Sequence, residues 1–417
     1  MTTSLYGPAP RLRLYTRLGQ YAAVLARVVT GRFDAGDGVR RLHDRLGEMF
    51  GRTAIAIPLA RTGIYLTVKI LIKPGQKVIL SPYTIADVVN MVITAGGIPV
   101  FADLDPDTCN ISADEVERLI NVDTGAVLVT HFYGLICEVE RIKAICDAHG
   151  VALIEDAAQA FGARMDGRLA GTFGTAGIFS FGLYKNVNAF YGGLVVSNDD
   201  EFLTSLNAEM AKLHVQPLGG FLKKVIGGLM TDTVTFPPLF GALFFWVFRH
   251  GCLKNIDVIN NKRKIDVAPN LKRVIPADYL HRISATQADL ILNQLDKVET
   301  HLQSRISAAE RYHAGLHDIG ELTLPPLRTD GSHIYWYFPI QAPDRHALVT
   351  YAMRHGRDIA ESYHRNCASL PCFSEWWRDC ANAERTANSV IYLPTYPGYP
   401  MAEVDANIRI IRAFYGA

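Results

Sequence analysis

Short apolar runs alternate with amphipathic stretches through the first half of the chain. The apolar runs have the length of strands and occupy residues 77–80, 98–101, 125–132 and 151–156. Such a run is typical of a strand buried on both faces, as in a parallel sheet that lies beneath helices. Apolar positions at helical spacing fill the stretches 64–72 and 139–145. The succession of strands and helices therefore predicts an α/β fold around a mostly parallel sheet with right-handed crossovers.

Local signals mark the ends of several expected helices. Ser112 followed by Glu115 forms a capping box, which predicts that a helix begins there. Gly150 follows an amphipathic stretch and suits the left-handed residue just past a helix end. Near the C-terminal third, apolar side chains predict one long helix that reaches into a smaller domain, with Leu290, Leu292, Leu295, Val298 and Leu302 on its inner side.

The composition narrows the class of protein. A length of 417 residues is too great for one compact core and suits two domains. The net charge of +1 gives no indication of nucleic-acid binding. Seven cysteines without a Cys-x-x-Cys pair argue against a disulfide framework and a structural zinc site, and they fit a reducing compartment. Neither a signal peptide nor an uninterrupted membrane span is visible, so we expect a cytoplasmic protein without a metal site.

Candidate chemistry gathers between residues 151 and 196. Asp156 ends an apolar strand, and carboxyl ends of strands are where α/β sheets place their ligands. Gln159 follows closely, and Ser180 precedes Lys185 in a segment rich in glycine and aromatic residues. A lysine considered alone is more often a solvated surface residue than a catalytic one. The combination of these four residues is what indicates a site.

These residues lie in a pattern that resembles the DegT/DnrJ/EryC1/StrS family of pyridoxal-phosphate (PLP) aminotransferases. The pattern is E-D-A-A-Q at 155–159, G-T-F-G-x-x-G-x-F-S-F at 171–181, K-N at 185–186 and G-G at 192–193. The resemblance implies a fold-type-I, aspartate-aminotransferase-like α/β fold with a smaller C-terminal α+β domain. It implies a basic helical arm at 1–52, a large PLP-binding domain at 53–305 and a small domain at 306–417.

The resemblance also implies how PLP is held. Lys185 would carry the cofactor as a Schiff base and transfer protons, and Asp156 would pair with the ring nitrogen. Thr62, which aligns with the threonine of the family's S-G-T, and Ser180 would bind the phosphate. Arg61 departs from the small residue of that motif and adds positive charge there. The remaining expected cofactor contacts are Gln159 at the ring hydroxyl, Asn186, and Tyr83 over the ring, since Ile85 replaces the family's stacking aromatic residue.

On the substrate side, the resemblance implies a homodimer that moves an amino group from glutamate or glutamine to a nucleotide- or lipid-linked keto-sugar. The expected substrate-side residues are His131, Tyr133, Arg282 and His364, while Leu280 replaces the asparagine of the family's N-x-R-M segment. Relatives with histidine in place of the lysine eliminate a hydroxyl instead, so a PLP-dependent dehydratase is one alternative. A non-catalytic sugar-binding or regulatory relative is another. Lys185 favours transamination.

A hydrophobic block at 221–248, inside an insert at about 205–270, is not explained by the family pattern. Between Gly219 and Lys254 the only acid is Asp232, and Pro237-Pro238 would break any helix there. The block is too short to span a bilayer as one helix. It predicts either burial at a subunit interface or a peripheral contact with the inner membrane through 219–254. The arm at 1–33, with five arginines and no acid, would add a second contact.

Overall fold

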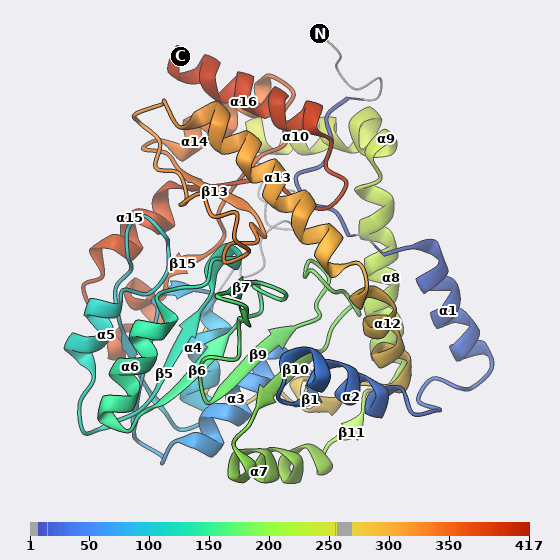
Figure 1. Cartoon of the computed structure of the whole chain (residues 1–417). Coiled ribbons are helices and arrows are strands. Elements are labelled where there is room, and N and C mark those ends of the chain that lie inside the picture. Colours follow the sequence, from blue (N-terminus) through green and yellow to red (C-terminus); the bar gives the residue numbers. More distant parts are fainter. Residues whose placement is uncertain (1–6, 15, 255, 257–268) are drawn as a thin grey trace.

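The computed structural model describes residues 7–14, 16–254, 256 and 269–417 (Figure 1). Its centre is a seven-stranded sheet in which only β10 runs antiparallel to its neighbours. The predicted α/β fold around a mostly parallel sheet is therefore confirmed. In spatial order the strands are β1 (Thr53–Ile57), β10 (Gly193–Ser197), β9 (Ala176–Ser180), β6 (Ala152–Asp156), β5 (Thr124–Thr130), β2 (Lys77–Leu80) and β4 (Ile98–Phe101).

Helices cover both faces of this sheet, because alternate strand residues enter two separate hydrophobic clusters. Val127 and Val129 of β5 belong to one cluster, and Ala126 and Leu128 belong to the other. The first cluster contains residues of α2 (Gly38–Phe50), α5 (Ala113–Leu119), α6 (Val139–His149) and α12 (Ala285–Leu295). The second contains residues of α3 (Ala60–Leu71), α4 (Ala86–Thr94) and α7 (Asp200–Ala211).

The predicted helix ends are largely as observed. The Ser112 hydroxyl accepts the Glu115 N–H at 3.4 Å and begins α5, and Gly150 takes a left-handed φ of 64° after α6. The single long helix predicted through residues 290–302 is wrong, because the chain breaks at Asp296 and Lys297 between α12 and α13 (Val298–Leu316). This break lets α13 continue into a separate C-terminal core, where Tyr312 is fully buried.

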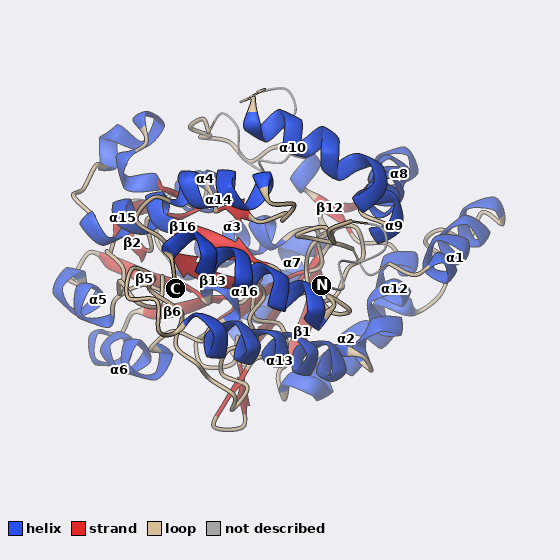
Figure 2. Ribbon diagram, turned by 90° about the horizontal axis from the view of Figure 1, so that it is seen from above, coloured by secondary structure: helices blue, strands red, loops and turns tan. Residues whose placement is uncertain are grey.

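That C-terminal core surrounds a small antiparallel sheet. Its strands, in spatial order, are β13 (Phe338–Gln341), β16 (Val390–Leu393) and β14 (Ala360–Glu361). Helices α13, α14 (Arg345–Arg354) and α16 (Met401–Tyr415) contribute buried residues to it, and α15 (Ala381–Ser389) lies nearby (Figure 2). Short strand pairs complete the fold: β3 (Tyr83–Thr84) with β15 (Arg365–Asn366), β7 (Arg164–Met165) with β8 (Arg168–Leu169), and β11 (His214–Val215) with β12 (His281–Arg282).

The hydrophobic block folds as a bent pair of helices. Helix α8 (Leu218–Val234) is followed by a turn at Phe236, then by α9 (Pro237–Leu239), a π-helical turn and α10 (Phe245–Leu253). The axis bends by 62° at this break, as the two prolines predict. Within the described residues no single helix is long and apolar enough to cross a membrane. This bent pair alone meets that test, by length and composition only.

Candidate active site

Lys185 and Asp156 come together where the central strands end. Asp156 is the last residue of β6, is 6% exposed, and accepts the Ala158 N–H at 3.0 Å. Burial raises the pKa of this carboxyl, while the Ala158 N–H and the charges of Lys185 and His131 lower it. Burial also lowers the pKa of Lys185 to about 8, although the Asp156 carboxylate favours the charged amine. Burial thus disfavours the charged form of both groups, and the opposite charge of each partner offsets part of that effect.

The indole ring of Trp336 gives the Lys185 amine a second partner. The Lys185 Nζ lies 4.2 Å from the ring centroid, a cation–π distance. The ring is fixed in turn, because the Trp336 Nε1–H donates to the Tyr184 carbonyl at 2.8 Å. The backbone N–H of Lys185 donates to the Gly182 carbonyl at 3.0 Å, which closes the turn after β9. The lysine therefore has a defined position instead of a free surface rotamer.

A cationic site lies at the start of α3. Arg61 pairs with Asp87 at 3.2 Å and donates to the Tyr279 hydroxyl at 3.1 Å, and the Thr62 hydroxyl donates to the Tyr279 carbonyl at 2.7 Å. Lys272 also pairs with Asp87 and bonds to it. Unpaired N–H groups and the positive end of the helix dipole favour anions at such a position. The two predicted phosphate ligands of the α3 turn therefore stand together, joined by Tyr279.

Strand β10 brings Ser180 to the same helix end. Gly193 pairs with Ser180 across the β9–β10 ladder. A Cβ at Gly193 would lie 3.0 Å from the Ala60 N and 2.7 Å from the Phe179 carbonyl, so only glycine allows this approach. The Ser180 hydroxyl accepts the Gly182 N–H at 3.4 Å. A phosphate group at the α3 N-terminus would thus meet the end of β9 as well.

Directly behind Asp156, Glu155 anchors the strand end. Its fully buried carboxylate accepts the N–H groups of Gly171, Phe173 and Gly174 at 2.6–2.8 Å and faces the His131 Nε2 at 3.0 Å. The His131 Nδ1 accepts the Cys137 N–H at 3.3 Å. Both ring nitrogens of His131 are therefore occupied, and the residue holds the frame of the site beneath Asp156.

Replacing Glu155 by alanine should destabilise the fold strongly. The substitution leaves three buried N–H groups and His131 without their acceptor, so we expect a loss of about 3–5 kcal/mol in the free energy of unfolding. Urea denaturation measures it. Asp123→Ala removes an exposed pair with Lys77 at 3.0 Å and is the control, with a loss of at most about 1 kcal/mol. Equal losses in the two variants would contradict the anchoring role.

Three of the predicted residues, Tyr83, Tyr133 and His364, meet in one buried hydrogen-bond network. Tyr83 bonds to the Tyr133 hydroxyl at 2.7 Å and to the Ser362 hydroxyl at 2.8 Å, and the His364 Nδ1 bonds to the Tyr392 hydroxyl at 2.7 Å. Tyr83 is 0% exposed and its ring packs on neighbouring aromatic rings. The network ties the end of β2 and the loop after β5 to the C-terminal sheet.

The other predicted residues have separate partners. The Gln159 side-chain oxygen accepts the Tyr133 N–H at 2.7 Å and holds that loop against the end of β6. Asn186 donates to the Phe161 carbonyl at 3.2 Å, while its buried Oδ1 has no hydrogen-bond partner among the described residues. Arg282 is exposed on β12 and donates to the Leu213 carbonyl at 3.0 Å. Asn186 thus retains an acceptor beside the lysine.

Sequence reasoning assigned no role to three residues that the structure places at the site: Glu155, Tyr279 and Trp336. Glu155 carried a signal, because a carboxylate in a strand buried on both faces requires several donors, and the glycine-rich 171–174 loop supplies them. Tyr279 and Trp336 reach the site only through tertiary packing, and no spacing along the chain relates them to Thr62 or Lys185.

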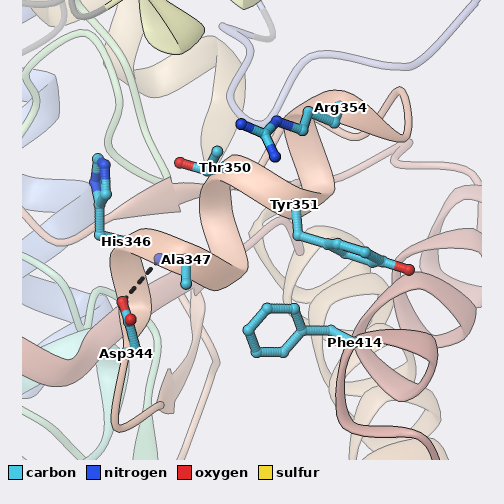
Figure 3. A pocket seen from close by; sticks show the side chains of 7 residues that line it. All are labelled: Asp344, His346, Ala347, Thr350, Tyr351, Arg354 and Phe414. Carbon is cyan, nitrogen blue, oxygen red and sulfur yellow. Dashed lines mark hydrogen bonds between the residues drawn. The ribbon is translucent and has the colours of Figure 1, made fainter.

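A surface hollow of the described structure lies elsewhere. It measures about 350 Å³ and is lined by α14 and the end of α16, including Asp344, Tyr351, Arg354 and Phe414 (Figure 3). Asp344 caps α14 by accepting the Ala347 N–H at 2.8 Å (Figure 3). None of the residues that line this hollow belongs to the Lys185 site, so the hollow does not mark the candidate active site.

A parallel sheet with one antiparallel strand, a lysine beside a strand-end aspartate and an anion site at a helix start together define an enzyme of the fold-type-I aminotransferase class. The family model of the DegT/DnrJ/EryC1/StrS aminotransferases matches residues 19–224 and 250–412, so the chain belongs to this family. The resemblance drawn from the sequence is thereby confirmed. Members of the family are PLP-dependent sugar aminotransferases. The unmatched residues 225–249 fall within the bent helix pair.

Individual relatives cover nearly the whole chain. A pleiotropic regulatory protein of Geobacillus stearothermophilus is 26% identical over 97% of this chain and 98% of its own length. The spore coat polysaccharide biosynthesis protein SpsC of Bacillus subtilis (strain 168) is 26% identical over 92% of this chain and 91% of its own. Helicobacter pylori PseC, an aminotransferase involved in the biosynthesis of pseudoaminic acid, shares the fold with a TM-score of 0.75 at 19% identity, over 99% and 98% of the two chains.

Proposed function

We propose that the protein transfers an amino group from glutamate or glutamine to a keto-sugar that is linked to a nucleotide or a lipid, with PLP as cofactor. The observation that carries the proposal is the pair of the half-buried Lys185 and the buried Asp156 beside the α3 N-terminus. We further propose a cytoplasmic homodimer. The peripheral membrane contact through 219–254 and 1–33 stays a prediction.

The described residues fit the chemical groups of PLP. A buried carboxylate suits the ring nitrogen, and a lysine amine whose pKa is about 8 suits an aldehyde. Arg61, Thr62 and Ser180 surround a helix start that suits a phosphate. The unpartnered Oδ1 of Asn186 leaves one acceptor for a bound donor group. Asp156 and Lys185 would hold the ring, and the α3 turn would hold the phosphate.

Each side chain then has a definable task. Bound PLP would supply the electron sink for the reaction. Asp156, fixed by the Ala158 N–H, would keep a proton on the ring nitrogen. Lys185, with a pKa of about 8, has an uncharged fraction at neutral pH that serves as nucleophile and then takes the proton from the α-carbon of the amino donor. The Trp336 ring, whose centroid lies 4.2 Å from the Lys185 Nζ, would help to position the amine.

The lowered pKa of Lys185 leads to a pH prediction. The charged amine does not attack an aldehyde, and the charged form predominates below a pKa of about 8. The rate at which the cofactor-free protein takes up PLP should therefore rise about tenfold per pH unit below that value and level off above it. Stopped-flow absorbance between pH 6 and 10 measures this rate. A midpoint near the ordinary value of 10.5 would show a solvated lysine instead.

A substrate panel tests the function directly. The purified protein with PLP is incubated with glutamate or glutamine and nucleotide-linked keto-sugars, and mass spectrometry detects the products. An amino-sugar supports the proposal. A deoxy-sugar without nitrogen would identify a dehydratase, and binding of sugar without turnover would identify a non-catalytic relative.

A further inference from the structure

Residues 225–249 of the bent helix pair lie outside the match to the family model, and the inner side of the pair is well packed. Phe221 and Val225 of α8 enter the first core cluster, while Phe240 and Phe245 pack on Met353 of α14. These four side chains are buried. The pair is therefore a structured part of the protein, and what its outer side contacts is a separate question.

The outer side of both helices is apolar and exposed. On α8, Ile226, Leu229 and Met230 are 56%, 44% and 64% exposed. In the second half of the pair, Leu243 of the π-helical turn is 58% exposed, and Trp246 and Val247 of α10 are 54% and 52% exposed. Both sets follow the spacing i, i+3, i+4, which places each set on one helix face. Side chains of this size are normally scattered singly over a protein surface. Two such apolar helix faces follow one another along the chain, on either side of the bend.

Helix α1 (Leu18–Val29) extends this surface. It lies beside α8 in both views (Figures 1 and 2) and is joined to it by the Tyr21 hydroxyl, which donates to Asp232 at 2.6 Å. Leu18, Leu25 and Val29 are 82%, 62% and 77% exposed. Their spacing puts them on one face of α1.

The charge of these segments favours an anionic partner. Asp232 is the only acid between Gly219 and Lys254, and it is bonded to Tyr21 instead of facing outward. Lys223 and Lys254 are exposed at the two ends of the pair. The first 33 residues contain five arginines and no acid, and two of these arginines, Arg11 and Arg27, pair with Asp358 and Asp289 of the protein. Apolar side chains with a tryptophan and flanking cations are the composition of a segment that lies in the interface of an anionic bilayer.

We propose that the outward faces of α8 and α10, together with that of α1, bind the surface of an anionic lipid bilayer. The bend between α8 and α10 keeps the pair on the surface instead of across the membrane, since both inner faces remain packed on the protein. Binding to the bilayer can be tested without a sugar substrate and without turnover. It places the enzyme beside a lipid-linked or membrane-delivered acceptor.

Co-sedimentation with vesicles of phosphatidylcholine and phosphatidylglycerol tests the proposal on the full chain with its cofactor. The wild type should sediment with these mixed vesicles at low salt. It should sediment less with vesicles of phosphatidylcholine alone. The double variant Met230→Asp/Trp246→Asp should bind at least about tenfold more weakly, since two apolar contacts are lost. The matched control Val122→Asp/Trp377→Asp changes side chains that are 98% and 65% exposed elsewhere, and it should bind as the wild type does.

A second measurement does not depend on the folding of the double variant. Brominated lipid should quench the fluorescence of the wild type, and Trp246→Phe should lose that quenching while still binding vesicles. Wild type that stays in the supernatant, equal binding by the double variant, or unchanged quenching in Trp246→Phe would each overturn the proposal. The wild type could fail to bind vesicles while Met230→Asp/Trp246→Asp forms a smaller assembly than the wild type in analytical ultracentrifugation. In that case the face is a contact between copies of this chain, and the proposal is wrong.

Discussion

Lys185→Ala should abolish transamination, with a loss of about 10⁴-fold or more, because one side chain supplies both the nucleophile and the proton carrier. The variant should still fold, since the hydrogen bond from the Lys185 backbone N–H to the Gly182 carbonyl does not involve the side chain. Turnover of glutamate with the acceptor that the panel identifies measures the effect.

The assignment has an independent chemical readout. Borohydride treatment of the PLP-loaded wild type should fix the cofactor on the peptide that contains Lys185, and peptide mass spectrometry finds it. Lys212→Ala removes an exposed lysine paired with Glu209 at 2.9 Å and is the control, with wild-type activity and labelling. A label on any other lysine would refute the role of Lys185.

Asp156→Asn should cost on the order of a hundredfold in turnover while the protein keeps its cofactor. The amide is nearly the same size and its oxygen can still accept the Ala158 N–H, so the loop should remain in place. What is lost is the negative charge that would hold a proton on the ring nitrogen, and a single preorganised electrostatic group contributes about 10²–10³ in rate. Steady-state kinetics, together with the absorbance of bound PLP, separate the two effects.

Asp123→Asn is the matched control, because it neutralises an exposed aspartate at the opposite end of the sheet, beside Lys77. It should leave turnover unchanged. Near-normal turnover in Asp156→Asn would mean that another residue faces the ring nitrogen.

Much of the fold could be predicted from the sequence, because the strands of the central sheet are buried on both faces and therefore stand out as apolar runs. The strand that ends in Asp156 and the glycine after α6 are where the pattern placed them. The division of the long helix at Asp296 was not predicted, since both halves carry apolar residues at the same spacing. What separates them is the existence of two cores, which is a tertiary property.

The candidate site shows the same limit. Lys185, Asp156, Thr62 and Ser180 could be named from local motifs. The partners that position them, such as Tyr279 for Thr62 and Trp336 for Lys185, are more than 150 residues away in the chain. The position of Tyr83 over the cofactor ring stays a prediction, and the motif did not reveal its hydroxyl partners Tyr133 and Ser362, which come from tertiary packing.

The single antiparallel strand affects how the protein folds. Strand β1 pairs only with β10, so this edge of the sheet forms only once residues near Ser197 pair with residues near Thr53. Pairings so distant along the chain form slowly, because a long loop must be ordered first. The segment that carries Lys185 connects β9 to β10, and Gly193 of β10 meets the start of α3. The strand pairing that closes this edge of the sheet therefore also brings the segment with Lys185 toward the start of α3.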